Sequence, residues 1–124
     1  MTKTNVCLFI VIGLVFMLPT PVLADFQAGL DAYERGDYGT ALKEWRPLAD
    51  QGLAAAQNNL GAMYINGEGV RRNYVRAYMW LSLAAKQGYK RAVSSQGQLE
   101  REMTPGELAE AERFAREWKP KGRE

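Results

Sequence analysis

The chain has 124 residues with 16 basic and 14 acidic side chains, a single cysteine and no histidine. This length provides for one domain, and a net charge of +2 gives no bulk attraction to nucleic acid. The lack of histidine removes the usual general base, and together with the cysteine count it excludes nearly all zinc chemistry.

The first 24 residues have the pattern of a signal peptide. Lys3 supplies a positive charge, an apolar run follows from Val6 to Leu18, and small or modest side chains lead up to Ala24. This run is shorter than the roughly 20 residues that a membrane-spanning helix needs, although an uncleaved membrane anchor is the alternative. We therefore expect export to the periplasm or out of the cell, with cleavage near Ala24–Asp25.

Cleavage there would leave residues 25–124, which contain no cysteine. The loss of Lys3 alone among the charged residues would give this part a net charge of +1. Because no disulfide can form within it, its stability has to come from packing.

The remaining sequence predicts an all-α fold, because no stretch alternates like a strand. The expected helices cover about residues 26–35, 38–51, 54–65, 73–87 and 90–102, and a sixth begins at the capping box Thr104-Pro105-Gly106-Glu107. The sixth helix has one apolar stripe, formed by Leu108, Ala111, Phe114, Ala115 and Trp118. Pro120 is expected to end it, and residues 121–124 form a charged tail.

Pro47 interrupts the pattern of the second helix. A proline inside a helix removes one hydrogen bond and crowds the carbonyl of the residue four positions earlier, here Lys43. We expect a kink or local break at this point, and two separate short helices are the alternative.

Small residues recur with a period of 36. The matched pairs are Ala41/Ala77, Ala49/Ala85, Gln51-Gly52/Gln87-Gly88, Ala56/Ala92 and Gly61/Gly97, and Tyr38 also matches Tyr74. Gly52 and Gly88 are expected to end helices in the left-handed conformation. The alanines and Gly61 are expected where two helices approach closely, with aromatic side chains filling the spaces between helices, at Tyr33, Tyr38, Trp45, Tyr64, Tyr74, Tyr78 and Trp80.

The stretch "AAAQNNLGAMYINGEGVRRNYVRAYMWLSLAAKQG" resembles a Sel1-like repeat, a helix-turn-helix unit of the tetratricopeptide class. It covers residues 54–88, with a shorter first unit at 26–52, a partial third unit at 90–102 and a capping helix at 104–119. Within the domain 25–120, the resemblance implies a right-handed α-α superhelix whose concave face binds a protein or peptide.

The resemblance also implies a function. Members of this family are commonly scaffolds or adaptors, which suggests a non-catalytic role in the cell envelope without a cofactor or metal. A cysteine-rich branch of the family is credited with penicillin binding and weak β-lactamase activity, so a weak cell-wall or β-lactam hydrolase is the alternative. Because this chain lacks the cysteine pairs of that branch, a β-lactam turnover assay is expected to show only background.

Two groups of residues look superficially catalytic. Asn66-Gly67-Glu68-Gly69 follows a predicted helix, whereas phosphate-binding glycine loops follow a strand or add Gly-Lys-Ser/Thr, so this segment is expected to be a hinge with positive φ at both glycines. The carboxylates of Asp31 and Glu34 share a helix face as glycosidase acids might, yet on an exposed helix they indicate a solvated surface.

The predicted partner-binding surface is the inner face formed by the first helix of each unit. Its residues are Gln27, Asp31, Glu34, Asn58, Asn59, Ala62, Ile65, Ser94, Gln98 and Arg101. Asn59 stands where related tetratricopeptide units hold a ligand backbone, because a planar amide both donates and accepts. The alternative, that Asn59 bridges neighbouring helices, is equally compatible with the sequence.

Three further features remain open. Arg71, Arg72 and Arg76 form a basic loop that would suit an acidic protein or anionic surface, although a solvated loop is the simpler interpretation. Met79 and Trp80 are expected to be buried against the third unit. Because two and a half repeats are fewer than the usual minimum of about three, self-association is possible, while the capping helix favours a monomer.

Overall fold

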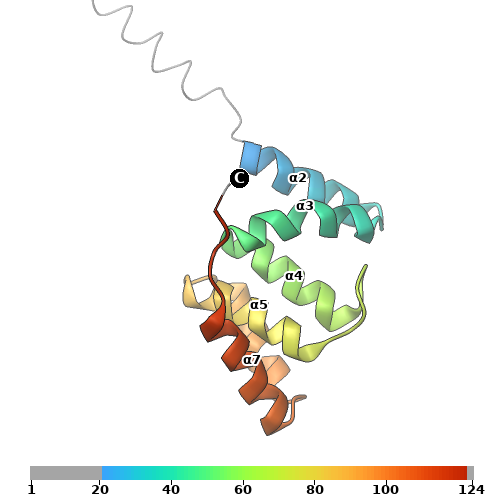
Figure 1. The fold of residues 1–124 in the computed structure, drawn as a ribbon. Coiled ribbons are helices and arrows are strands. Elements are labelled where there is room, and N and C mark those ends of the chain that lie inside the picture. Colours follow the sequence, from blue (N-terminus) through green and yellow to red (C-terminus); the bar gives the residue numbers. More distant parts are fainter. Residues whose placement is uncertain (1–20, 123–124) are drawn as a thin grey trace, which may run out of the picture.

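The computed structural model describes residues 21–122, so the predicted signal peptide lies largely outside the described residues (Figure 1). The described part contains helices and no strand, which confirms the all-α prediction. The helices are α2 (Pro21–Glu34), α3 (Tyr38–Asp50), α4 (Ala54–Asn66), α5 (Tyr74–Lys86), α6 (Lys90–Glu100) and α7 (Pro105–Glu117).

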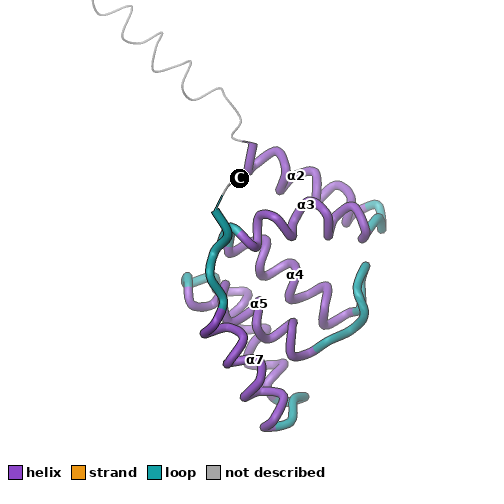
Figure 2. Tube along the Cα trace, viewed as in Figure 1, coloured by secondary structure: helices purple, strands orange, loops and turns teal. Residues whose placement is uncertain are grey.

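The helices form a right-handed stack of antiparallel pairs. α2 packs on α3, α3 on α4, and α4 on α5, so the first two units share a continuous interface. The partial third unit, α6, and the capping helix, α7, both pack on α5. In Figure 1, α6 lies behind α5 and α7 in front of it. Figure 2 shows that the connections are short except for the loop between α4 and α5.

Glycines in the left-handed conformation end the helix pairs as expected. Gly52 has φ 103° after α3, and Gly88 has φ 86° after α5. Only glycine takes this conformation at little steric cost, which explains why the two residues recur 36 positions apart.

The helix boundaries differ from the predicted ones mainly at the two ends of the domain. α2 begins at Pro21 rather than near residue 26, so the predicted cleavage site lies within its first two turns. α7 ends at Glu117, because Trp118 is already extended, with ψ 138°. At its start, Thr104 accepts a hydrogen bond from the backbone N–H of Glu107, which confirms the predicted cap.

Pro47 does not break α3, which runs as one helix from Tyr38 to Asp50. The predicted break, and the alternative of two short helices, are therefore wrong. Pro47 lies near the C-terminal end of α3, where its own carbonyl still accepts from the N–H of Gln51 at 3.1 Å. The Lys43 carbonyl loses its usual donor, and the helix still continues to Asp50.

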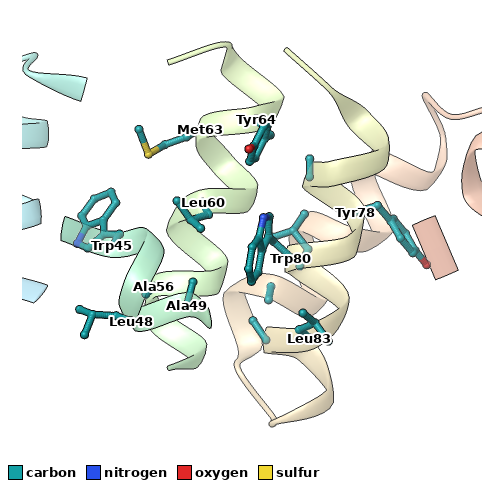
Figure 3. Packing of buried hydrophobic residues seen from close by; sticks show 14 of the residues in the cluster. Trp45, Leu48, Ala49, Ala56, Leu60, Met63, Tyr64, Tyr78, Trp80 and Leu83 are labelled. Carbon is teal, nitrogen blue, oxygen red and sulfur yellow. The ribbon is translucent and has the colours of Figure 1, made fainter. Parts of the chain in front are cut away.

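The core lies between α3, α4 and α5 (Figure 3). Its fully buried side chains include Trp45, Leu60, Met63 and Leu81, and the recurring Ala41, Ala49, Ala56, Ala77 and Ala92 are completely inaccessible. Gly61 lets α4 approach α5 closely, because a Cβ there would lie 2.7 Å from Cγ of Leu81. These observations confirm the close packing predicted from the small residues of the second unit.

The match between Gly61 and Gly97 does not extend to packing. Gly97 is exposed on α6, and a Cβ built there meets nothing within 4 Å. Among the described residues, α6 has α5 as its one substantial helix neighbour, so the equivalent position has no helix to approach.

Candidate binding surface

The loop between α4 and α5 is anchored to the first unit. Glu68 accepts hydrogen bonds from the Tyr33 hydroxyl at 2.9 and 2.8 Å to its two oxygens, and from the Asn66 amide at 3.0 Å. Gly67 and Gly69 have φ 69° and 71°, as predicted for a structural turn. A Cβ on Gly69 would lie 3.0 Å from the Tyr38 carbonyl oxygen, so the backbone of the loop touches α3. The carboxylate of this glycine-rich stretch is thus used in holding two units together.

The tyrosines that contact this carboxylate titrate abnormally. Burial, followed by the hydrogen bond to Glu68, raises the pKa of Tyr33 to about 12. The pKa of Tyr38 is raised chiefly by its hydrogen bond to the same carboxylate. Tyr33 also packs against Tyr38 and Trp45, with ring centroids 5.2 and 5.7 Å apart. Tyr33 is therefore part of the packing between helices, as predicted.

A buried glutamine joins the first and second units. Gln57 on α4 is completely buried and donates to the Ala49 carbonyl at 3.1 Å. Its own oxygen accepts from the Gln87 amide at 3.0 Å, and Gln87 also donates to the Gly52 carbonyl at 2.8 Å. Sequence reasoning missed these side-chain roles, although the recurrence of Gln51-Gly52 at Gln87-Gly88 had marked the position of Gln87.

On α2, the predicted surface residues Gln27, Asp31 and Glu34 are exposed. The Gln27 amide donates to the Asp31 carboxylate at 2.9 Å, one helical turn away. Such a pair restricts both side chains on the helix surface and presents a carboxylate with accepting capacity left for a partner.

On α4, the predicted residues are more enclosed. Asn58 is only 8% exposed, so a partner would reach little of it. Asn59, Ala62 and Ile65 are half-buried, and Ile65 packs against the core. Within residues 21–122, the Asn59 side chain makes no hydrogen bond, so no bridge to a neighbouring helix is seen there.

Ser94 and Gln98 on α6 are exposed, as is Arg101, the residue that directly follows this helix. The structure therefore places the predicted surface on the first helices of the three units, α2, α4 and α6, with its accessible polar groups on α2 and α6. α4, which lies between α2 and α6 in the sequence, contributes half-buried small and apolar residues.

The basic loop is accessible. Arg71, Arg72 and Arg76 are exposed, and none of them forms an ion pair within the described part of the chain. The guanidinium carbon of Arg72 lies 5.2 Å from the centre of the Tyr74 ring, a cation–π arrangement that orders one of the three side chains.

Two aromatic residues that sequence reasoning considered are structural. Tyr64 is buried, and its hydroxyl accepts from Arg46 of α3 at 2.8 Å. Trp80, labelled in Figure 3, is also buried, and its ring centroid lies 6.5 Å from that of Trp118, just after α7, in an edge-to-face arrangement. Met79 is half-buried next to it. The predicted burial of Trp80 is confirmed, but the aromatic partner that the structure shows is Trp118 of the capping segment and not a residue of the third unit.

The described residues carry no sign of a metal centre or a membrane span. Histidine, cysteine, aspartate and glutamate side chains form no cluster of three or more suited to a metal ion between residues 21 and 122. In the same range, every helix is too short or too polar to cross a membrane.

Comparison with known proteins assigns the repeat. The Sel1 repeat family model matches residues 54–89, which comprise α4, the anchored loop, α5 and the glycine turn that follows. Residues 54–89 of this chain therefore form a Sel1-like repeat. A search of curated proteins finds no match.

A solved Sel1-like structure has the same helical arrangement. It is the crystal structure of c5321, a protective antigen present in uropathogenic Escherichia coli strains that displays an SLR fold. It superposes with a TM-score of 0.72 and 31% identity over 78% of this chain. The present chain corresponds to 22% of the length of that structure. Sel1-like repeats generally mediate protein–protein interaction and are typically non-enzymatic scaffolds.

Proposed function

We propose that this chain is a non-catalytic scaffold or adaptor of the cell envelope that binds a protein or peptide through the face formed by α2, α4 and α6. The observation that carries the proposal is the three-unit Sel1-like stack, which presents exposed polar side chains on the first helix of its outer units. The apolar segment before the described residues, with its small side chains leading to Ala24, supports export.

The side chains of this face suit recognition of a peptide. Asp31 on α2 and Arg101 directly after α6 offer opposite charges, and Asn59 and Gln98 offer amides that both donate and accept. Gln57 and the loop between α4 and α5 link the first unit to the second. The surface is therefore ordered before a partner binds. A preformed surface loses little conformational entropy on binding, which favours affinity.

Crosslinking in living cells tests this function. A photoreactive residue at Gln98 or Asp31 is expected to capture one protein reproducibly, whereas the same residue at Glu110, exposed on α7, is expected not to capture it. Asn58 is unsuitable as a probe position because it is buried. Capture from Glu110 but not from Gln98 and Asp31 would contradict the proposed binding face.

A further inference from the structure

A second surface of the molecule has the features of a binding groove. It lies along the exposed side of α3, on the second helix of the first unit, and the chain that follows α7 borders it. The groove is lined by Gly39, Leu42, Lys43, Arg46, Pro47, Asp50, Gln51, Lys121 and Gly122. None of these residues belongs to the face formed by α2, α4 and α6.

The C-terminal segment forms one wall of this groove because it folds back along the stack. Figure 1 shows it running from α7 past the turn after α3. The backbone N–H of Lys121 donates to the Asp50 carbonyl at 2.8 Å, and the Lys121 amine lies 3.6 Å from the Asp50 carboxylate. Trp118 lies 3.8 Å from where a Cβ of Gly52 would be. A helix and an extended segment thus run side by side with a groove between them.

The groove carries more positive than negative charge. Lys43, Arg46 and Lys121 line it, and its only carboxylate, Asp50, is already paired with Lys121. Lys43 has no carboxylate partner among residues 21–122, and Arg46 uses a single guanidinium donor for Tyr64. An occupant with negative charge would therefore be favoured.

The floor of the groove is partly apolar. Leu42 is half-buried, Pro47 is exposed, and Gly39 has no side chain. These residues give an incoming peptide apolar surface to rest on.

The length of the lining stripe sets the size of the occupant. From Gly39 to Asp50 the helix rises about 16 Å at 1.5 Å per residue. An extended peptide covers this distance with about five residues. Such a segment can place separate carboxylates near Lys43 and Arg46 of α3 and near Lys121 of the C-terminal segment.

We propose that the groove between α3 and the C-terminal segment binds a short acidic peptide segment of a partner protein. The carboxylates of the peptide meet Lys43, Arg46 and Lys121, and its apolar side chains rest on Leu42 and Pro47. The site is separate from the face formed by α2, α4 and α6, so the protein has two binding surfaces.

A fluorescent peptide of alternating glutamate and leucine is the probe. The purified chain is expected to bind it in a salt-dependent manner, with amide shifts at Leu42, Gln51 and Lys121, and to ignore the same peptide with lysine in place of glutamate. Lys43→Glu is expected to weaken binding at least about fivefold, and Lys43→Glu combined with Lys121→Glu further still. Arg91→Glu changes the net charge equally on exposed α6 and is the matched control, expected to leave affinity within about twofold.

Several outcomes would overturn the proposal. They are the absence of peptide binding, an equal effect of Lys43→Glu and Arg91→Glu, and binding to phosphatidylglycerol vesicles in place of the peptide. Amide shifts confined to α2, α4 and α6 would also overturn it while supporting the proposed function. Conversely, peptide binding along α3 without any partner captured at Gln98 or Asp31 would support this groove and count against the proposed function.

Discussion

The second and third units share a sequence period, but their equivalent residues have different surroundings. Gly61 on α4 faces Leu81 at a distance that excludes a side chain, whereas Gly97 on α6 has open space around it. Gln57 is buried in a hydrogen-bond network, and the residue 36 positions later, Val93, is 54% exposed. α4 has helix neighbours on both sides, whereas α6 packs mainly on α5. The side chain that is tolerated at a given position of the repeat therefore depends on the neighbouring helices.

The largest contrast is expected between two alanine substitutions. Gly61→Ala would place Cβ 2.7 Å from Leu81 Cγ and 3.3 Å from the Ala77 carbonyl oxygen, so the free energy of unfolding should fall by about 1–3 kcal/mol. Gly97→Ala should raise it by about 0.5–1 kcal/mol, because the exposed helix gains propensity without a clash. Urea unfolding of both variants measures the difference. Equal effects would mean that α4 and α6 are packed alike.

The buried glutamine gives the next largest contrast. Gln57→Ala leaves the Ala49 carbonyl without the Gln57 donor and the Gln87 amide without one acceptor, at a cost of about 1–3 kcal/mol in unfolding free energy. Val93→Ala at the equivalent exposed position should stay within about 0.5 kcal/mol of the parent. Thermal and urea unfolding would check both values, and a neutral Gln57→Ala would show that the network adds no stability.

Glu68 is expected to stabilise the loop between α4 and α5. Glu68→Ala removes the acceptor of the Tyr33 hydroxyl and should cost about 1 kcal/mol of unfolding free energy. Backbone amides of residues 67–73 should then exchange with solvent faster, while those of α6 keep their rates. Glu110→Ala, exposed on α7, is the control and should change neither region. Unchanged exchange in the loop would contradict its anchoring by Glu68.

A smaller effect is expected in alkaline solution. The pKa of Tyr33 is raised in the folded protein to about 12 from 10.0, so the folded state holds this proton more tightly than the unfolded state. The associated stability is fully present below pH 10 and is lost as the pH rises toward 12. Tyr78, also raised to about 12 by burial and then by its bond to Glu100, contributes in the same direction. Tyr33→Phe should flatten the fall in unfolding free energy over this range, and an unchanged slope would contradict the assignment.

The local features of the fold were predictable because they depend on nearby residues. Gly52 and Gly88 mark helix ends wherever a left-handed residue is needed, and Thr104 caps the helix that follows it. Pro47 was interpreted less well. Pro47 lies near the end of α3, where it removes one helical hydrogen bond without interrupting the helix. The general rule that proline breaks a helix interior overstates its effect here.

The features that depend on contacts between units could not be predicted. Glu68 lies 35 residues from Tyr33, and no local pattern indicates that the two meet. Likewise, the path of the chain after α7 decides that Lys121 reaches Asp50 and borders a groove on α3. The period of 36 identified the repeating unit, but the exposure of Gly97 followed only from the absence of a packed neighbour on that side.

We propose that the first helices of the stack form a preformed surface for a protein partner. An amide-shift titration of the purified chain with the protein captured through Gln98 or Asp31 tests this directly. We expect shifts at residues 27–34, 58–66 and 94–101 without a change in helix content, because the stack is already ordered. A titration that leaves all three stretches unshifted, or that shifts α7 alone, would contradict the claim.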